Sequence, residues 1–365
     1  MRLGDCGKTN LHTYSDKEKW SLIRYLDTGS ITEGRIDEIQ TLYPGVDKIP
    51  SRARRKASVG DILFSTVRPN QKHYGIIEAG TENLLVSTGF TVVTVDTTIA
   101  DPYFIYYYLT QSSVIESLQA IAEQSTSTYP SIKPSDIEDI ELDLPELETQ
   151  KKIGSTLRML DRKIALNEEI NDNLQQQAQA IYSSMFIDNP DPAWSHGHLS
   201  DLITVKYGKD HKKLADGIYP VYGSGGIMRY VERPLYNKES VLIPRKGTLN
   251  NVMYVNQPFW SVDTMFYTEM KLPNVAKFVY HFVKAKDLVS MNAGSAVPSM
   301  TTDILNAMEV VIPSASALEE FESLVAPMYE AMEANDVQSK ALSQMRDTLL
   351  PKLMSGEIDV SAVQL

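Results

Sequence analysis

The chain has 365 residues, 42% of them apolar and 22% charged, a composition typical of globular proteins that leaves room for two or three domains. Its formal net charge is −12, which argues against nucleic-acid binding through overall charge alone. Cys6 is the only cysteine, so an intramolecular disulfide is excluded. The sequence contains no apolar run of 18 residues and no signal peptide, and we expect a cytoplasmic protein that makes no contact with a membrane.

The charge is unevenly distributed along the chain. Residues 1–145 hold 14 Lys and Arg against 20 Asp and Glu, whereas residues 196–313 hold 13 against 10. Within the acidic first part, residues 48–72 hold seven basic side chains and one acidic side chain. The distribution of charge is therefore more informative than its sum.

The first predicted elements are strands over 61–67 and 85–95 and a helix over 102–111. Basic residues precede the first strand, and polar residues capable of donating hydrogen bonds stand at its end. In chain order these residues are Arg52, Arg54, Arg55, Lys56, Ser65, Thr66, Arg68, Asn70 and Lys72. A basic cluster beside such a strand end could bind phosphates from the cluster and base edges from the strand end. A solvated charged loop is the alternative.

A proline-marked turn, a short strand over 140–144 and a long helix follow. The apolar residues of the helix repeat every four and three positions, which places them on one seam. These seam residues are Ile153, Leu157, Leu160, Ile164, Leu174 and Ile181. A helix of about 40 residues would be about 60 Å long, and so long a seam needs a partner.

The partner is predicted 168 positions later, where the same pattern returns. The second set of seam residues is Phe321, Val325, Met328, Met332, Leu342 and Leu349, and Asn335 matches Asn167. The segment 129–132 before the first helix is likewise matched by 297–300 before the second. The chain therefore contains an internal repeat of a globular part followed by a long helix.

The second globular part has predicted strands over 240–243 and 259–268 and a helix over 275–288. Its candidate DNA-binding residues are again basic and polar. They are Lys206, Lys209, Lys212, Lys213, Ser224, Arg245, Lys246, Thr248 and Asn250. The glycine-rich stretch 223–226 could hold a phosphate, but it lacks the phosphate-loop pattern, and a tight turn is the favoured interpretation.

Several catalytic signatures are missing from the sequence. We find no phosphate-binding Walker loop, no zinc-protease motif, no hydrolase nucleophile motif and no convincing nuclease or methyltransferase signature. Cys6 and the scattered histidines do not make a metal site. We therefore predict no catalytic residue and no metal ligand in this chain.

Five motifs in order resemble the specificity subunit of type I restriction-modification systems. They lie at residues 60–69, 87–90, 219–226, 245–248 and 349–358. The resemblance implies an α+β fold in which two target recognition domains are separated by two long antiparallel helices that form a coiled coil. It further implies that each domain binds one half of a split site in double-stranded DNA.

The resemblance also predicts domain boundaries and partners. It places the recognition domains at 1–145 and 191–313, the spacer helices at 146–190 and 314–357, and a tail at 358–365. Methyltransferase subunits would dock along the helices and bind S-adenosylmethionine. Motor-nuclease subunits would use ATP and Mg²⁺, so this chain itself would bind no cofactor. A two-domain scaffold for a ligand other than nucleic acid and a cryptic nuclease are the competing interpretations.

Overall fold

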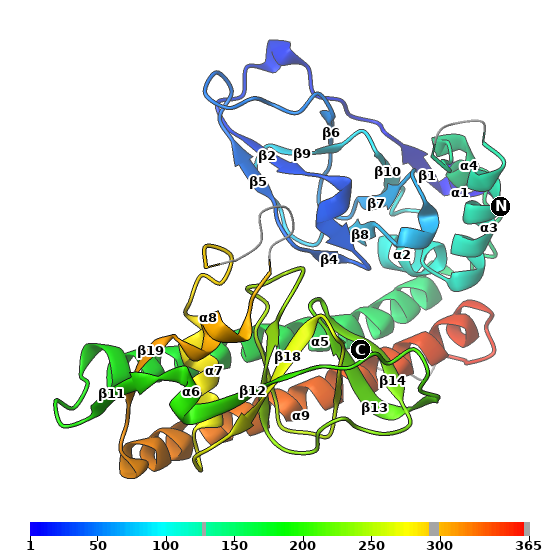
Figure 1. Cartoon of the computed structure of the whole chain (residues 1–365). Helices are drawn as coiled ribbons and strands as arrows, with labels where there is room; N and C mark the ends of the chain where they lie inside the picture. The colour runs from blue at the N-terminus through cyan, green and yellow to red at the C-terminus, as the bar shows by residue number, and fades with distance from the viewer. Residues whose placement is uncertain (126–128, 292–298, 361–365) are drawn as a thin grey trace. The chain divides into compact units, whose positions relative to one another are not determined.

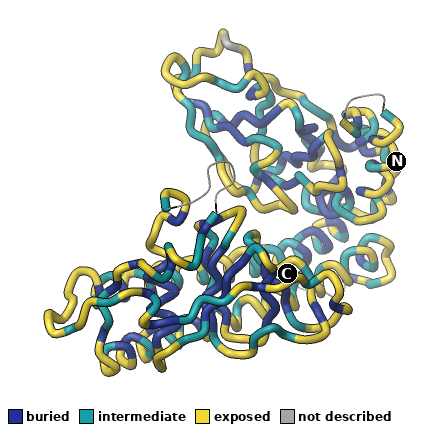
Figure 2. The backbone as a smooth tube through the Cα atoms, viewed as in Figure 1, coloured by how far each residue is buried: buried dark blue, intermediate teal, exposed yellow. Residues whose placement is uncertain are grey.

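A computed structural model of the chain describes residues 1–125, 129–291 and 299–360 (Figure 1). The chain forms two compact units. The first unit comprises Met1–Leu166 with Val337–Leu365, and the second comprises Asn167–Asp336. In each unit the strands are mostly buried and the turns exposed, as Figure 2 shows.

The first unit contains two four-stranded sheets and a small hairpin. The first sheet has the antiparallel order β1 (Gly7–Thr9), β10 (Phe90–Val95), β7 (Ile62–Ser65) and β8 (Tyr74–Ile76). The second sheet has the order β5 (Gln40–Leu42), β2 (Ile23–Leu26), β9 (Leu84–Ser87) and β6 (Ala53–Lys56). The hairpin pairs β3 (Ile31–Thr32) with β4 (Arg35–Ile36). The α-helices before the long one are α1 (Leu3–Cys6), α2 (Pro102–Leu109), α3 (Ser112–Glu123) and α4 (Pro134–Glu138).

The second unit has a sheet of the same kind. Its antiparallel order is β12 (Ile203–Tyr207), β18 (Met265–Met270), β15 (Ser240–Pro244) and β16 (Met253–Val255). A second sheet has the order β14 (Gly226–Val231), β13 (Asp216–Gly223) and β17 (Trp260–Ser261), and β11 (Ser195–His198) pairs with β19 (Glu309–Ile312). The short helices are α6 (Leu199–Leu202), α7 (Ala276–Lys284) and α8 (Thr302–Asn306).

The strand orders support the internal repeat within the globular parts. The sheet β1-β10-β7-β8 corresponds strand for strand to β12-β18-β15-β16. The second sheets also correspond, because each contains one parallel pair, β2 with β9 and β13 with β17. The strand β6, which carries Arg54, Arg55 and Lys56 and pairs with β9, is reduced in the second unit to a single antiparallel bridge between Tyr236 and Phe259. Three of the four basic residues of the cluster at 52–56 therefore lie on a strand that is longer in the first unit than in the second.

Three strand predictions need correction. The stretch 85–95 is two strands in different sheets, β9 and β10, separated by a turn at Thr88 and Gly89. The stretch 259–268 is likewise divided into β17 and β18. Residues 140–144 form no strand. They meet the chain start through a single bridge between Arg2 and Glu141, whereas the equivalent β19 has the full partner strand β11.

The two long helices are α5 (Leu147–Ser183, 37 residues) and α9 (Ala315–Met354, 40 residues). They pack together antiparallel, because Arg346 contacts Asp161 and Asn335 contacts Asn167. At the centre, Asn335 Nδ2 donates to Asn171 Oδ1 at 2.8 Å. The expected α+β fold with two sheet-containing parts and a long helix pair is confirmed.

The seam residues contact the globular parts as well as the opposite helix. Ile153, Leu157 and Leu349 pack into the core of the first unit. Five others pack into the core of the second unit, namely Ile181, Phe321, Val325, Met328 and Met332. The remaining members are half-buried, namely Leu160, Ile164, Leu174 and Leu342. The helix ends therefore supply core residues to both units. In the predicted tail, Val360 is also buried in the core of the first unit. Residues 361–365 lie outside the described part of the chain.

Equivalent polar links join each globular part to a long helix. In the first unit, the Tyr107 hydroxyl donates to Asp161 Oδ2 at 2.6 Å, and Arg346 Nη1 donates to Asp161 Oδ1 at 2.7 Å. In the second unit, His281 Nε2 lies 3.0 Å from the Tyr329 hydroxyl. His281 follows Tyr107 by 174 positions and Tyr329 follows Asp161 by 168, so the two links occupy corresponding places of the repeat.

A second pair of links has opposite polarity in the two units. The buried Lys277 of α7 donates to Glu322 of α9 at 2.5 Å, so here the globular part carries the cation. In the first unit Arg158 of α5 donates to Glu78 at 2.9 Å, so there the helix carries the cation. Each globular part is thus matched chemically to its own helix.

Acidification should destabilise the second unit through His281. Burial lowers the pKa of this imidazole to about 4, whereas its ordinary value is 6.5. Below pH 6.5 the unfolded chain gains a proton that the folded chain does not bind until about pH 4, so stability falls across this window as pH is lowered. We expect a loss of up to about 3 kcal/mol. Urea unfolding followed by tryptophan fluorescence in a Trp20→Phe background reports Trp194 and Trp260, both in the second unit.

The control is His281→Phe in the same background, since phenylalanine suits the aromatic surroundings of Tyr182 and Phe321 but cannot titrate. This variant should be less stable at pH 7, because Gln179 and Tyr329 lose their partner. Its stability should fall less between pH 6.5 and 4. Equal falls in parent and variant would contradict the assignment.

Candidate nucleic-acid interface

The segments that follow β7 and β15 are held in the same way in the two units. We call residues 66–72 the β7 loop and residues 245–251 the β15 loop. Each loop begins with a residue whose carbonyl accepts a backbone N–H at 2.9 Å, and the next residue forms a β-bridge. The carbonyls of Thr66 and Arg245 accept the N–H groups of Ile132 and Met300, respectively. The bridges join Val67 to Ser131 and Lys246 to Ser299. The two loops are therefore structural equivalents.

Both loops contain a residue in the left-handed region at the same place. Arg68 has φ +49° and Gly247, 179 positions later, has φ +87°. Glycine adopts this conformation without steric cost, whereas an arginine is strained in it. The backbone of Arg68 is fixed there by its N–H, which donates to the Pro130 carbonyl at 3.0 Å.

The predicted residues of the first unit differ in accessibility. Arg52, Arg68, Asn70 and Lys72 are exposed, and Arg54, Arg55, Lys56 and Thr66 are half-buried. Ser65 is 3% exposed, and its hydroxyl donates to the Val67 carbonyl at 3.1 Å. This hydroxyl shapes the strand end, so Ser65 is not assigned to the DNA-binding surface.

Several predicted cations have partners within the first unit. Lys56 pairs with Glu18 at 2.5 Å and lies over the Trp20 ring, and Lys72 pairs with Glu33. Arg55 is different: its Nε and Nη1 atoms are shielded from solvent and have no hydrogen-bond partner in the described structure, and this burial lowers its pKa. A phosphate cannot reach these two atoms unless the site rearranges, so Arg55 is not assigned to that surface either.

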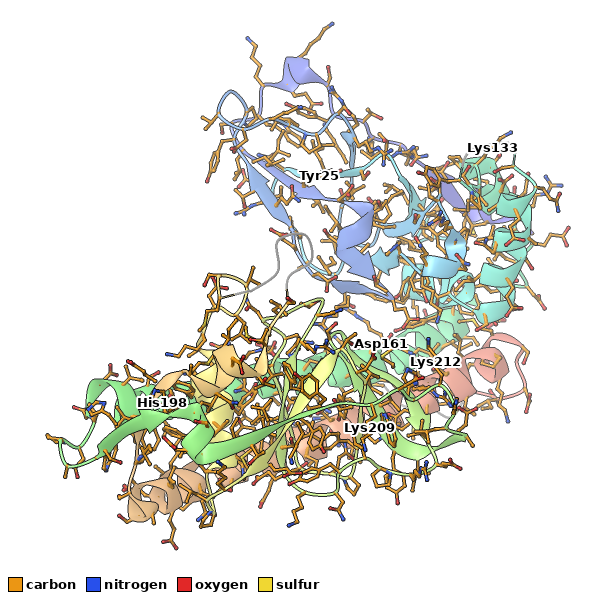
Figure 3. All side chains as sticks on the ribbon, in the orientation of Figure 1. Tyr25, Lys133, Asp161, His198, Lys209 and Lys212 are labelled. Carbon is orange, nitrogen blue, oxygen red and sulfur yellow. The ribbon has the colours of Figure 1, made fainter. Side chains whose placement is uncertain are left out.

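In the second unit the predicted lysines lie on β12 and on the segment that joins it to β13. Lys209 and Lys212, labelled in Figure 3, are exposed, as is Lys213. Lys206 on β12 is half-buried and lies 3.6 Å from Glu269. The Trp260 indole N–H donates to the Lys209 carbonyl at 2.8 Å, which fixes the start of this segment against the core.

The glycine-rich stretch is a turn. Gly223 pairs with Gly226 where β13 returns as β14, and Gly226 has φ +110°. The tight turn that the sequence analysis favoured for this stretch is confirmed. The half-buried Ser224 in this turn accepts a hydrogen bond at its carbonyl from Asn251 of the β15 loop at 2.8 Å. The turn therefore supports the β15 loop.

The β15 loop presents four predicted residues. Lys246, Thr248 and Asn250 are exposed, and Arg245 is half-buried. Arg245 lies over the Tyr207 ring at 5.4 Å, and its Nη1 donates to the Asp263 carbonyl at 3.0 Å. Asn250 Nδ2 donates to Asp287 Oδ1 at 3.3 Å.

The structure adds features that the sequence argument missed. The aromatic rings beside the loop arginines, Tyr129 and Tyr207, are far from their partners in sequence, so local composition could not pair them. The left-handed backbone at Arg68 did leave a signal, because the repeat aligns this residue with a glycine. Extending the 179-residue offset between β7 and β15 into the loops that follow them would have aligned Arg68 with Gly247.

Among residues 1–125, 129–291 and 299–360, no group of three or more His, Cys, Asp or Glu side chains is placed to hold a metal ion. Over the same residues, every helix is too short or too polar to cross a bilayer.

Comparison with known proteins gives consistent results. The family described as "Type I restriction modification DNA specificity domain" matches residues 53–176 and 193–321. The chain is 22% identical over 467 residues to the type I restriction enzyme HindI specificity subunit of Haemophilus influenzae, with 98% of each chain covered. It is 24% identical over 346 residues to the MjaIX specificity subunit of Methanocaldococcus jannaschii, with 82% of this chain and 78% of that one covered. The crystal structure of a type I restriction-modification S subunit from M. genitalium shares the fold, with a TM-score of 0.60, 18% identity, and coverage of 97% and 95%.

Proposed function

Because the chain belongs to the type I restriction-modification DNA specificity family, we propose that each of its two units reads one half of a bipartite site in double-stranded DNA. The observation that carries the proposal is the equivalence of the β7 and β15 loops. Both begin at the end of a buried strand and are anchored by the same backbone contacts, yet they present different side chains. Two matched loops with different polar ends suit a protein that recognises two different half-sites.

Phosphate contacts are assigned to basic side chains outside the two loops. In the first unit these are Arg52, Arg54 and Lys56, and in the second they are Lys206, Lys209, Lys212 and Lys213. Lys56 and Lys206 must leave or share their acidic partners to bind a phosphate, so they should contribute less than Lys209, Lys212 and Lys213.

Base contacts are assigned to the loops. The β7 loop offers Thr66, Arg68, Asn70 and Lys72, and the β15 loop offers Arg245, Lys246, Thr248 and Asn250. Hydroxyl, amide and guanidinium groups donate or accept hydrogen bonds in the patterns that distinguish base pairs in the major groove.

The chain is a non-catalytic subunit, and the remaining chemistry is assigned to its partners. Methyltransferase subunits would dock along α5 and α9 and bind S-adenosylmethionine. Motor-nuclease subunits would join the complex and use ATP and Mg²⁺. The net charge of −12 supports this division, since an acidic chain needs partners to neutralise much of the DNA backbone.

A two-domain scaffold for a ligand other than nucleic acid is the alternative. Family membership and the polar loops both favour DNA. Sequence-selective, salt-dependent binding of duplex DNA by the chain with its methyltransferase subunits would decide for DNA, and its absence would decide for the scaffold.

Neutralising one phosphate-binding lysine should weaken binding to all DNA sequences equally. For Lys212→Ala we expect the slope of log K against log salt concentration to fall by about one unit, because one fewer counterion is released. The recognised sequence should not change. The measurement is a salt titration of binding to cognate and non-cognate duplexes by the chain with its methyltransferase subunits.

Lys238→Ala is the matched control, since Lys238 is an exposed lysine of the same unit that lies outside the proposed surface. It should leave the slope unchanged. The phosphate assignment fails if Lys212→Ala changes the preferred sequence while the slope stays at the parent value.

Shortening both helices should shorten the gap between half-sites. Deleting Asn167–Asn173 and Asn335–Ala341 removes one heptad from α5 and from α9, keeps the seam in phase and shortens each helix by about 10 Å. The gap should fall by at most about three base pairs, given about 3.4 Å per pair and some bending of the DNA. The half-sites should stay the same, because neither loop is touched. Methylome sequencing of cells expressing the variant with its partner subunits measures both.

The control keeps the length and changes the side chains. Asn167→Ala with Asn335→Ala removes the two hydrogen bonds that these side chains donate to the opposite helix, at the Asn335 carbonyl and at Asn171 Oδ1, but no helical turn, so its gap should equal that of the parent. If the deletion leaves the gap unchanged, the helices do not set the spacing.

A further inference from the structure

The backbone of Arg68 is in the left-handed region, which residues with a Cβ atom disfavour. It has φ +49° and ψ +70°, and the equivalent residue of the other unit is Gly247. A glycine at position 68 would relieve this strain, so the fold gives no reason for an arginine there. Strained residues that persist on an exposed loop point to a functional side chain. Arg68 is exposed and lies in the proposed DNA-binding loop.

The second unit has its arginine two positions earlier, at the place equivalent to Thr66. A side chain at Gly247 would have its Cβ 2.6 Å from Ser224 Oγ, so an arginine there would force Ser224 to move and would be strained by φ +87°. Arg245 supplies the guanidinium instead. Each loop therefore contains one arginine, placed differently on the same backbone frame.

Both guanidinium groups are held by an exposed tyrosine ring. Arg68 lies 5.3 Å from the centre of the Tyr129 ring, and Arg245 lies 5.4 Å from that of Tyr207. The rings are 58% and 52% exposed. Within the described part of the chain neither arginine forms an ion pair, in contrast to Lys56 and Lys72. Contact with a ring orients the guanidinium while its charge remains available, as do its donors apart from Arg245 Nη1, which donates to the Asp263 carbonyl.

We propose that Arg68 and Arg245 are the specificity-determining residues of the two units, and that each donates two hydrogen bonds to a guanine in the major groove of its half-site. The planar guanidinium matches the O6 and N7 acceptors of guanine, which no other base presents together. The inference rests on the proposed function and extends it by naming one base and one side chain in each half-site.

The experiment uses the full chain with its methyltransferase subunits. Arg68→Gly should leave the Tm no lower than that of the parent, because glycine accepts the left-handed backbone. Its discrimination at one G·C pair of the first half-site should fall by about 10- to 100-fold, with the second half-site unaffected. Arg245→Lys keeps the charge but not the planar fork, and should relax one G·C pair of the second half-site only. Methylome sequencing and competition binding with single-base variants measure both effects.

Arg68→Lys is the second variant, since it keeps both the charge and the strained backbone. A loss of discrimination with little change in the salt slope supports base reading by the guanidinium. If Arg68→Gly and Arg68→Lys keep every base preference of the parent, the inference is overturned while the proposed function stands. A parent complex that methylates without sequence preference would overturn the proposed function and the inference together.

Discussion

The structure depends on the antiparallel pairing of two helices that are copies of one another. In an antiparallel pair of this kind, a residue can lie opposite its own counterpart in the repeat at only one position along the helices. Asn167 and Asn335, 168 positions apart, meet there, and Asn167 Nδ2 donates to the Asn335 carbonyl at 3.4 Å. Asn167 is fully buried, so a slipped register would place an amide against apolar side chains. The polar contact at the centre thus favours the observed register, which the apolar packing of the helix ends also holds.

The sequence predicted what depends on periodicity. Heptad spacing located α5 and α9, and the 168-residue offset showed that they are related. It could not show what covers a buried face, because periodicity reports only that a face is apolar. Phe321 and Val325 fit the seam pattern but lie in the core of a globular part. Likewise 85–95 resembles one continuous strand, and only its hydrogen-bond partners reveal that it serves two sheets.

The candidate site was predictable in position but not in detail. The basic cluster and the polar strand ends were visible as local composition. Their acidic partners were not, since Glu18 is 38 residues from Lys56 and Glu33 is 39 from Lys72. The burial of Ser65 and of two Arg55 nitrogens depends on tertiary packing as well. Residue types alone therefore predicted more groups free to bind a ligand than the structure provides.

The matched polar links have a consequence for how such chains evolve. A crossover that placed the second globular part on the first helix would put Gly154, the counterpart of Glu322, near the buried Lys277, which would lose the shorter of its two ion pairs and keep only the 3.4 Å contact with Glu239. A crossover that carries the helix along keeps Lys277 with Glu322 and His281 with Tyr329. Genetic exchange is therefore constrained to whole modules of domain plus helix, and new combinations of half-sites arise by trading such modules rather than bare domains.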